Sequence, residues 1–256
     1  MKYFIDTEFI EGTQKSWFGR NTKPTIDLIS IGIVAEDGRE YYAISKDFNL
    51  KEAWNRWQQR TGQGDRNNIE PKEYWIRENV LKPIYNELNC KENEIYNTYP
   101  YNNFDEFNYK SLKWLINKYG KSNKQIAKEI KQFITYNNSI NYEKQEMIIE
   151  KLSNPKFYGY YADYDWVVFC WLFGKMTDLP ENFPMYCIDL KQTLDEKAFI
   201  LLKNIEMFDA TSDLNFSNSL KFIKSRSDFP KQTNEHNALA DARWNFELYK
   251  FLNNLF

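Results

Sequence analysis

Several short segments of this chain are rich in apolar and aromatic residues, and each such segment predicts a β-strand. Three of these segments, at residues 2–6, 26–35 and 40–45, follow one another and predict an antiparallel meander. Two later segments, at 157–161 and 186–188, predict strands that join the meander in parallel. The pattern therefore predicts one mixed sheet.

Between and after these strands, apolar residues recur at the spacing of amphipathic helices. Helices are predicted for residues 51–60, 74–88, the stretch that follows Ser122, 166–173, the stretch from Asp189 to about 202, and 238–252. Gly62-Gln63-Gly64-Asp65 is expected to end the first helix. Ser122-x-x-Gln125 has the form of a capping box, Gly174 is a candidate C-cap and Asn237 is a candidate N-cap.

This order of elements predicts an α/β fold with a central mixed sheet flanked by helices. With 256 residues the chain can bury a substantial core, and one domain is the expected organisation. Because the sequence contains no internal repeat and no clear linker, we expect a single domain over residues 1–256.

The charge balance narrows the range of partners. A formal net charge of −2 argues against tight binding of long duplexes, which requires a basic surface. A small groove that binds the end of a strand remains compatible, because bound cations can supply positive charge locally. The sequence shows neither an apolar run of membrane-spanning length nor a secretory signal pattern, so we expect a cytoplasmic protein. Cys170 and Cys187 lie in apolar surroundings and are expected to be buried free thiols, which suits a reducing compartment.

Two acidic residues follow the first strand segment with one residue between them. Strand side chains alternate, so Asp6 and Glu8 point to the same side, with their Cα atoms about 6.5–7 Å apart. Carboxylates so placed can share a divalent cation, and a third carboxylate would let them hold two cations about 3.5–4 Å apart. Acidic residues are common at strand ends, so this pair alone is weak evidence for a metal site.

The one histidine of the chain, His236, lies five residues before Asp241. On a continuous helix five residues span about 500° of rotation, so these two side chains would face different ways. They converge only if His236 lies before the start of the helix, and an N-cap at Asn237 would place it there. The alternative is a surface or capping histidine without a chemical role.

A third acidic position lies where the strand at 157–161 leads into the helix at 166–173. Asp163 and Asp165 both occupy this junction. Open α/β sheets place their ligands near such strand ends. One of the two aspartates can instead be a helix N-cap, and we assign that role to Asp163.

Taken in order, these motifs resemble those of the DEDDh 3′–5′ exonucleases, a branch of the RNase H-like (DnaQ-like) fold. The first motif is Asp6-Thr7-Glu8, and the second is Asp165 preceded by the aromatic Tyr164. The third is His236 and Asp241 with four residues between them. Each motif alone is weak, whereas three in the family's order with its last spacing are specific.

The flanks of these motifs resemble a small bacterial and bacteriophage subfamily of stand-alone 3′–5′ exoribonucleases. The flanks that carry this resemblance are Phe4–Ile10, Leu28–Ala43 and Leu172–Met176. It extends over residues 1–45, about 121–200 and 231–252. Within about 46–120 this chain is longer than the short members of that subfamily, and the resemblance gives no interpretation of these insertions.

The resemblance implies a complete catalytic site. Its metal ligands would be Asp6, Glu8, Asp165 and Asp241, holding two Mg²⁺ or Mn²⁺ ions, and its general base would be His236. The enzyme would release 5′-mononucleotides from single-stranded 3′ ends of RNA. Neighbouring residues that could contact the substrate are Thr7, Phe9, Tyr164 and Trp166.

Two other functions are weighed against this one. The first is a 3′–5′ DNA exonuclease with the same chemistry, which matched RNA and DNA substrates would distinguish. The second is a non-catalytic nucleic-acid-binding protein with a vestigial metal site, against which His236 argues because binding needs no general base. The expected compartment is the cytosol of a bacterium or of a phage-infected host. The sequence leaves the oligomeric state open, with a homodimer as one option.

A stretch within the insertions interleaves aromatic residues and arginines, from Trp54 to Arg60, with Arg66 following. Such groups can stack on bases and contact phosphates. The interpretation that we favour is that Trp54 and Trp57 pack a helix onto the sheet while the arginines are solvated.

Overall fold

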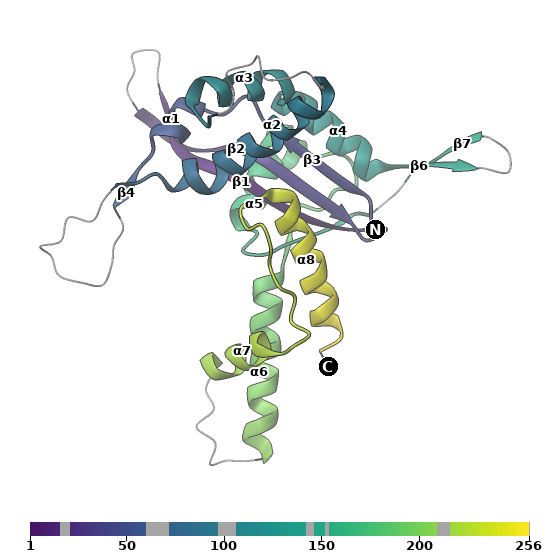
Figure 1. The fold of residues 1–256 in the computed structure, drawn as a ribbon. Helices are drawn as coiled ribbons and strands as arrows, with labels where there is room; N and C mark the ends of the chain where they lie inside the picture. The colour runs from purple at the N-terminus through teal and green to yellow at the C-terminus, as the bar shows by residue number, and fades with distance from the viewer. Residues whose placement is uncertain are drawn as a thin grey trace, which may run out of the picture. The chain divides into compact units, whose positions relative to one another are not determined.

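Five strands form the central sheet of the computed structural model (Figure 1), which describes residues 1–15, 21–59, 72–96, 106–141, 146–151, 154–208 and 216–255. In sheet order they are β3 (Glu40–Ile44), β2 (Asn21–Ala35), β1 (Lys2–Lys15), β8 (Lys156–Gly159) and β9 (Ile188–Asp189). Strand β8 pairs in parallel with both β1 and β9. The predicted α/β fold with a mixed sheet is confirmed.

The other elements in the described part of the chain are helices and two short hairpins. The α-helices are α1 (Leu50–Asn55), α2 (Lys82–Tyr96), α3 (Tyr109–Tyr119), α4 (Asn123–Thr135), α5 (Asp163–Phe173), α6 (Leu190–Phe208), α7 (Phe216–Ser225) and α8 (Ala238–Asn253). A π-helix, η1 (Arg77–Leu81), precedes α2, and a 3₁₀ turn, η2 (Met176–Asp178), follows α5. The hairpins pair β4 (Gln58–Gln59) with β5 (Lys72–Glu73), and β6 (Tyr136–Asn141) with β7 (Glu146–Lys151). None of the described helices combines the length and the apolar character of a membrane-spanning segment.

The chain divides into two compact units, each with its own core. The first unit comprises Met1–Thr7, Ile31–Tyr42 and Ala127–Phe256. Its core packs Phe4 and Tyr158 of the sheet against Leu194 of α6 and Leu248 of α8. The second unit comprises Glu8–Ser30 and Ala43–Ile126, and its buried residues include Ile29, Leu81, Leu112 and Leu115. A single domain over the whole chain stays a prediction.

Local sequence signals predicted the end of α5 and the starts of α6 and α8 correctly. The Asn237 side chain accepts a hydrogen bond from the Ala240 N–H at 3.0 Å, and α8 begins at Ala238. The Asp189 carboxylate accepts bonds from the backbone N–H groups of Lys191 and Gln192, which caps α6 as expected. Gly174 ends α5 with a φ of 119°, a conformation that favours glycine.

Other expectations were wrong in extent or role, and α6, for example, runs to Phe208 rather than to about 202. Helix α1 ends at Asn55 rather than at residue 60, because Arg56 is already extended. Strand β1 runs to Lys15 rather than ending at residue 6. Asp163 is the first residue of α5 rather than its N-cap, which is Ala162, and the Asp163 side chain is exposed.

The predicted helix at 74–88 extends to Tyr96 and opens with the π-helix η1. The ring of Pro83, near the start of α2, excludes a backbone N–H donor and crowds the preceding turn. The wider π turn accommodates this residue, and the Lys82 N–H bonds the Arg77 carbonyl five residues back.

The predictions for Cys170 and for the Trp54 stretch have mixed outcomes. Cys170 is a buried free thiol, as expected, whereas Cys187 is half-buried. Trp54 is half-buried, with the Arg77 guanidinium 4.6 Å from its ring centroid, whereas Trp57 is 48% exposed. Arg60, Arg66 and the predicted break at 62–65 lie outside the described residues.

Candidate metal centre

Strand β1 presents the first motif with the alternation expected of a strand. Asp6 and Glu8 are half-buried, whereas Thr7 between them is buried. Thr7 therefore faces the opposite side of the strand from the two carboxylates.

The start of α8 presents the third motif. His236 lies before the first helical residue, as the N-cap at Asn237 predicted, and has a φ of 65°. This left-handed conformation turns the His236 backbone N–H toward Asp241, whose Oδ2 accepts it at 2.9 Å. The other oxygen of Asp241 accepts a bond from Gln232 Nε2 at 2.6 Å. The buried Asp241 carboxylate is thus fixed from both sides.

A close approach between α8 and the sheet brings these motifs together. A Cβ added at Gly32 of β2 would lie 2.2 Å from the carbonyl oxygen of Ala238 and 2.5 Å from the Cα of Leu239. Only a glycine leaves room there for the first turn of α8. Gly32 therefore determines how near Asp241 lies to the sheet.

Three carboxylates converge as a result. Asp6, Glu8 and Asp241 each offer one oxygen, and these oxygens lie within 4.8 Å of one another. Two oxygen ligands of one divalent cation, at about 2.0–2.6 Å each, are separated by at most about 4–5 Å. The spacing and the hard oxygen donors therefore fit Mg²⁺ or Mn²⁺.

Asp165 lies beside the same stretch of β1 but is not a member of this trio. Its Oδ1 accepts two hydrogen bonds from Thr7, from the backbone N–H at 2.8 Å and from Oγ1 at 2.6 Å. Only 7% of Asp165 is exposed, and burial raises its pKa from 3.8 to about 6, although the Thr7 hydrogen bonds oppose this shift. His236 also lies outside the trio.

The electrostatics of the site favour a cation. Burial raises the pKa of Asp241 as well, and the hydrogen bonds from Gln232 and His236 only partly oppose that shift. A raised carboxyl pKa means that the ionised form is under-stabilised by its surroundings. Positive charge placed among these groups would relieve that cost.

The four residues predicted to contact substrate differ in their surroundings. Thr7 is turned into the protein, toward Asp165. Trp166 is buried against Phe157 and Phe169, with ring centroids 5.1 and 5.0 Å away. Phe9 is half-buried, and Tyr164 is 50% exposed. The packing of Trp166 corresponds to a core residue, because its neighbours cover the ring.

Sequence reasoning missed two polar residues next to the trio. Gln232 holds Asp241, as described above, and nothing in the local sequence distinguishes it. Asn245 donates from Nδ2 to the carbonyl of Ile5 at 2.9 Å and is 1% exposed. Asn245 lies four residues after Asp241, so an amide on the helix face that carries a ligand was the available signal.

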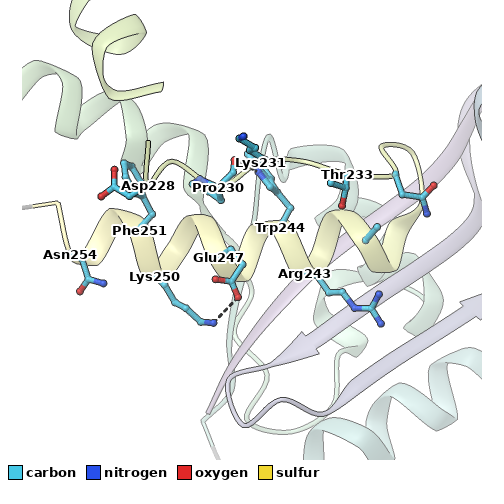
Figure 2. A pocket seen from close by; sticks show the side chains of 12 residues that line it. Asp228, Pro230, Lys231, Thr233, Arg243, Trp244, Glu247, Lys250, Phe251 and Asn254 are labelled. Carbon is cyan, nitrogen blue, oxygen red and sulfur yellow. Dashed lines mark hydrogen bonds and ion pairs between the residues drawn. The ribbon is translucent and has the colours of Figure 1, made fainter. Parts of the chain in front are cut away.

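A pocket of about 590 Å³ is lined by residues of α8 and of the segment 228–234 that precedes it (Figure 2). Trp244 and Lys231 help to line it, and the Trp244 indole N–H bonds the Pro230 carbonyl at 3.0 Å. Lys250 on its rim pairs with Glu247 at 2.6 Å. Asp241, which belongs to the trio, and Asn245 both lie on the buried side of α8. The pocket is therefore separate from the carboxylate site.

Comparison with known proteins supplies the context for this site. The family model of the "3′-5′ exoribonuclease Rv2179c-like domain" matches residues 1–252. Two curated relatives come from Mycobacterium tuberculosis, "3′-5′ exoribonuclease MT2234.1" of strain CDC 1551 / Oshkosh and "3′-5′ exoribonuclease Rv2179c" of strain ATCC 25618 / H37Rv. Each is 28% identical over 198 residues, which is 77% of this chain and 76% of the relative. Because the family model covers nearly the whole chain, this protein belongs to the Rv2179c-like 3′–5′ exoribonuclease domain family.

Proposed function

We propose that this chain is a metal-dependent 3′–5′ exoribonuclease of the DEDDh type. The observation that carries the proposal is the convergence of Asp6, Glu8 and Asp241 within 4.8 Å, in a chain that belongs to an exoribonuclease family. The placement of Asp165 against the same strand, and of His236 before α8, supports the same assignment.

Asp6, Glu8 and Asp241 would hold divalent cations, with Asp165 as the fourth carboxylate. The cations supply two effects when bound, since they lower the pKa of a water nucleophile and stabilise negative charge on the leaving oxygen. Thr7 orients Asp165 through two hydrogen bonds, and Gln232 orients Asp241 through one. The protein thereby fixes its ligands before the substrate arrives, as a preorganised site requires.

His236 would act as the general base. Its imidazole accepts the proton that the attacking water loses, while the water oxygen bonds to the terminal phosphorus and the bond from phosphorus to the 3′ oxygen breaks. The leaving 3′ oxygen takes a proton from solvent, so the products are a 5′-mononucleotide and a strand one nucleotide shorter with a new 3′ hydroxyl. The backbone N–H of His236 donates to Asp241, so this bond ties the proposed base to one of the proposed ligands.

The substrate that we infer is the single-stranded 3′ end of RNA. RNA is inferred from the family and from the printed names of the relatives. A net charge of −2 offers little long-range attraction for duplexes, so recognition would depend on the last nucleotides and the bound cations. The cytoplasm is the compartment that we infer for this reaction.

The test uses one RNA sequence in three forms, labelled at the 5′ end, labelled at the 3′ end, and circular, incubated with Mn²⁺ or with a chelator. We expect stepwise shortening of the 5′-labelled strand, release of a labelled mononucleotide from the 3′-labelled strand, and an intact circle. An Asp6→Asn protein should be inactive. Cutting of the circle, or activity in the chelator, would overturn the proposal, and a matched DNA strand would show whether the enzyme prefers RNA.

A further inference from the structure

Strand β8 stops pairing with β1 just before the metal centre. The register pairs are Lys2 with Lys156, Tyr3 with Phe157, and Phe4 with Tyr158. Strand β8 ends at Gly159, and Tyr161, with a φ of 55°, lies in the turn that leads into α5. Strand β8 therefore ends before the position opposite Asp6.

A β8 residue opposite Asp6 would have made two specific backbone hydrogen bonds with β1. In a parallel ladder, the residue opposite Asp6 donates its N–H to the carbonyl of Ile5 and accepts from the N–H of Thr7. Buried backbone groups left without partners are costly, so other groups must replace that residue. Two side chains do so, since Asn245 Nδ2 donates to the Ile5 carbonyl at 2.9 Å and Asp165 Oδ1 accepts from the Thr7 N–H at 2.8 Å.

We propose that Asn245 is a positioning residue of the metal centre, which fixes the peptide group that precedes Asp6. Together, Asn245 and Asp165 replace the strand residue that β8 does not provide. This inference rests on the proposed function for its consequence, the affinity for metal. The hydrogen bond itself is observed in the structure and does not depend on that function.

The place of Asn245 on α8 gives its hydrogen bond a second effect. Residues four apart lie on one face of a helix, so Asn245 projects beside Asp241. The amide thus joins the strand that carries Asp6 to the helix that carries Asp241. Both residues belong to the carboxylate trio, so the separation of two ligands depends on this bond.

The chemistry at position 245 requires an amide of this length. An ionised aspartate has the same shape but only accepts hydrogen bonds, so it would face the Ile5 carbonyl without a proton to donate. A serine keeps a donor but is too short to span the same gap. Either substitution leaves a buried carbonyl without its partner.

The test compares Asn245→Asp and Asn245→Ser with Tyr3→Phe as a matched control. The Tyr3 hydroxyl donates to the Ile134 carbonyl at 3.0 Å, so the control also removes one buried side-chain bond to a backbone carbonyl. Tyr3 lies on the same strand, three residues before Asp6. Three quantities are measured: the melting temperature without metal, the Mn²⁺ dissociation constant by calorimetry, and the hydrogen-exchange rate of the Thr7 amide without metal.

We expect all three variants to have a lower melting temperature than the wild type. Only the Asn245 variants should bind Mn²⁺ about 10-fold to 100-fold more weakly, which is typical when a group that orients ligands is lost. Only these variants should exchange the Thr7 amide faster. If Asn245→Asp does not fold, Asn245→Ser carries the comparison.

A wild-type Mn²⁺ affinity and Thr7 exchange rate in the Asn245 variants would overturn the inference, as would equal changes in Tyr3→Phe. The two proposals fail separately. If the wild type binds Mn²⁺ but does not shorten RNA, the proposed activity fails while the calorimetry still tests Asn245. If the wild type binds no Mn²⁺, the metal site fails and the exchange rate of Thr7 alone decides whether Asn245 fixes this strand.

Discussion

Replacing Asp165 by asparagine should stabilise the metal-free protein while it abolishes activity. The pKa of Asp165 is raised from 3.8 to about 6, chiefly by burial. A raised carboxyl pKa means that the folded state holds the proton more tightly than the unfolded state does. The stability associated with protonation is therefore fully present below pH 3.8 and is lost as the pH rises through about 6.

The size of the effect follows from the two pKa values. Above pH 6 the folded protein carries a buried charge whose cost corresponds to about 3 kcal/mol at 25 °C. Asparagine carries no charge, and its carbonyl oxygen can still accept both hydrogen bonds from Thr7. We therefore expect Asp165→Asn to raise the free energy of unfolding at pH 8 by up to about 3 kcal/mol.

Urea unfolding in a chelator, at pH 8, 6 and 4, measures this difference. The gain over the wild type should shrink as the pH falls, because Asp165 becomes protonated in the folded wild type. Asp163→Asn is the matched control, since Asp163 is exposed two residues earlier on α5 and should change stability by less than about 0.5 kcal/mol. A variant no more stable than the wild type at pH 8, or a gain independent of pH, would refute the reasoning.

Three further substitutions test other parts of the site. His236→Ala should lower turnover by about 10²–10⁴-fold while calorimetric Mn²⁺ binding persists, and loss of that binding would make His236 a ligand. Gly32→Ala should lower both the melting temperature and the affinity for Mn²⁺, because its Cβ would lie 2.2 Å from the Ala238 carbonyl oxygen. An unchanged melting temperature would contradict that close approach. Thr7→Val removes the hydroxyl that donates to Asp165. It should lower the free energy of unfolding in a chelator at pH 8 by about 1–3 kcal/mol. An equal or greater decrease at pH 4 would show that the charge of Asp165 is not the cause.

The start of α8 could be predicted from sequence because its rules are local. Asn237 caps the helix within four residues of itself, and this cap places His236 outside the helix. The spacing to Asp241 then had only one arrangement in which both side chains could approach one site. The alternation of Asp6 and Glu8 on a strand is equally local.

The contacts that hold these groups could not be predicted, because they depend on where β8 ends. Asn245 bonds a carbonyl 240 residues away in the chain, and Asp165 bonds Thr7 across 158 residues. Trp166 follows Asp165 in the sequence and was a possible substrate contact, and in the structure its ring stacks in the core on Phe169. Periodicity shows which face of a helix is buried, but it does not show which backbone group that face meets.

The early end of β8 accounts for the position of the carboxylate cluster of Asp6, Glu8 and Asp241. Open α/β sheets bind ligands beyond the carboxyl ends of their strands, where neighbouring strands separate. Here the separation leaves two backbone groups beside Asp6 without strand partners, and side chains from α5 and α8 satisfy them. The same interactions that restore hydrogen bonding at this edge bring Asp165 and the helix of Asp241 against the strand of Asp6. Substitutions at Asp165 and Asn245 should therefore affect both folding and metal binding, since one set of hydrogen bonds serves both.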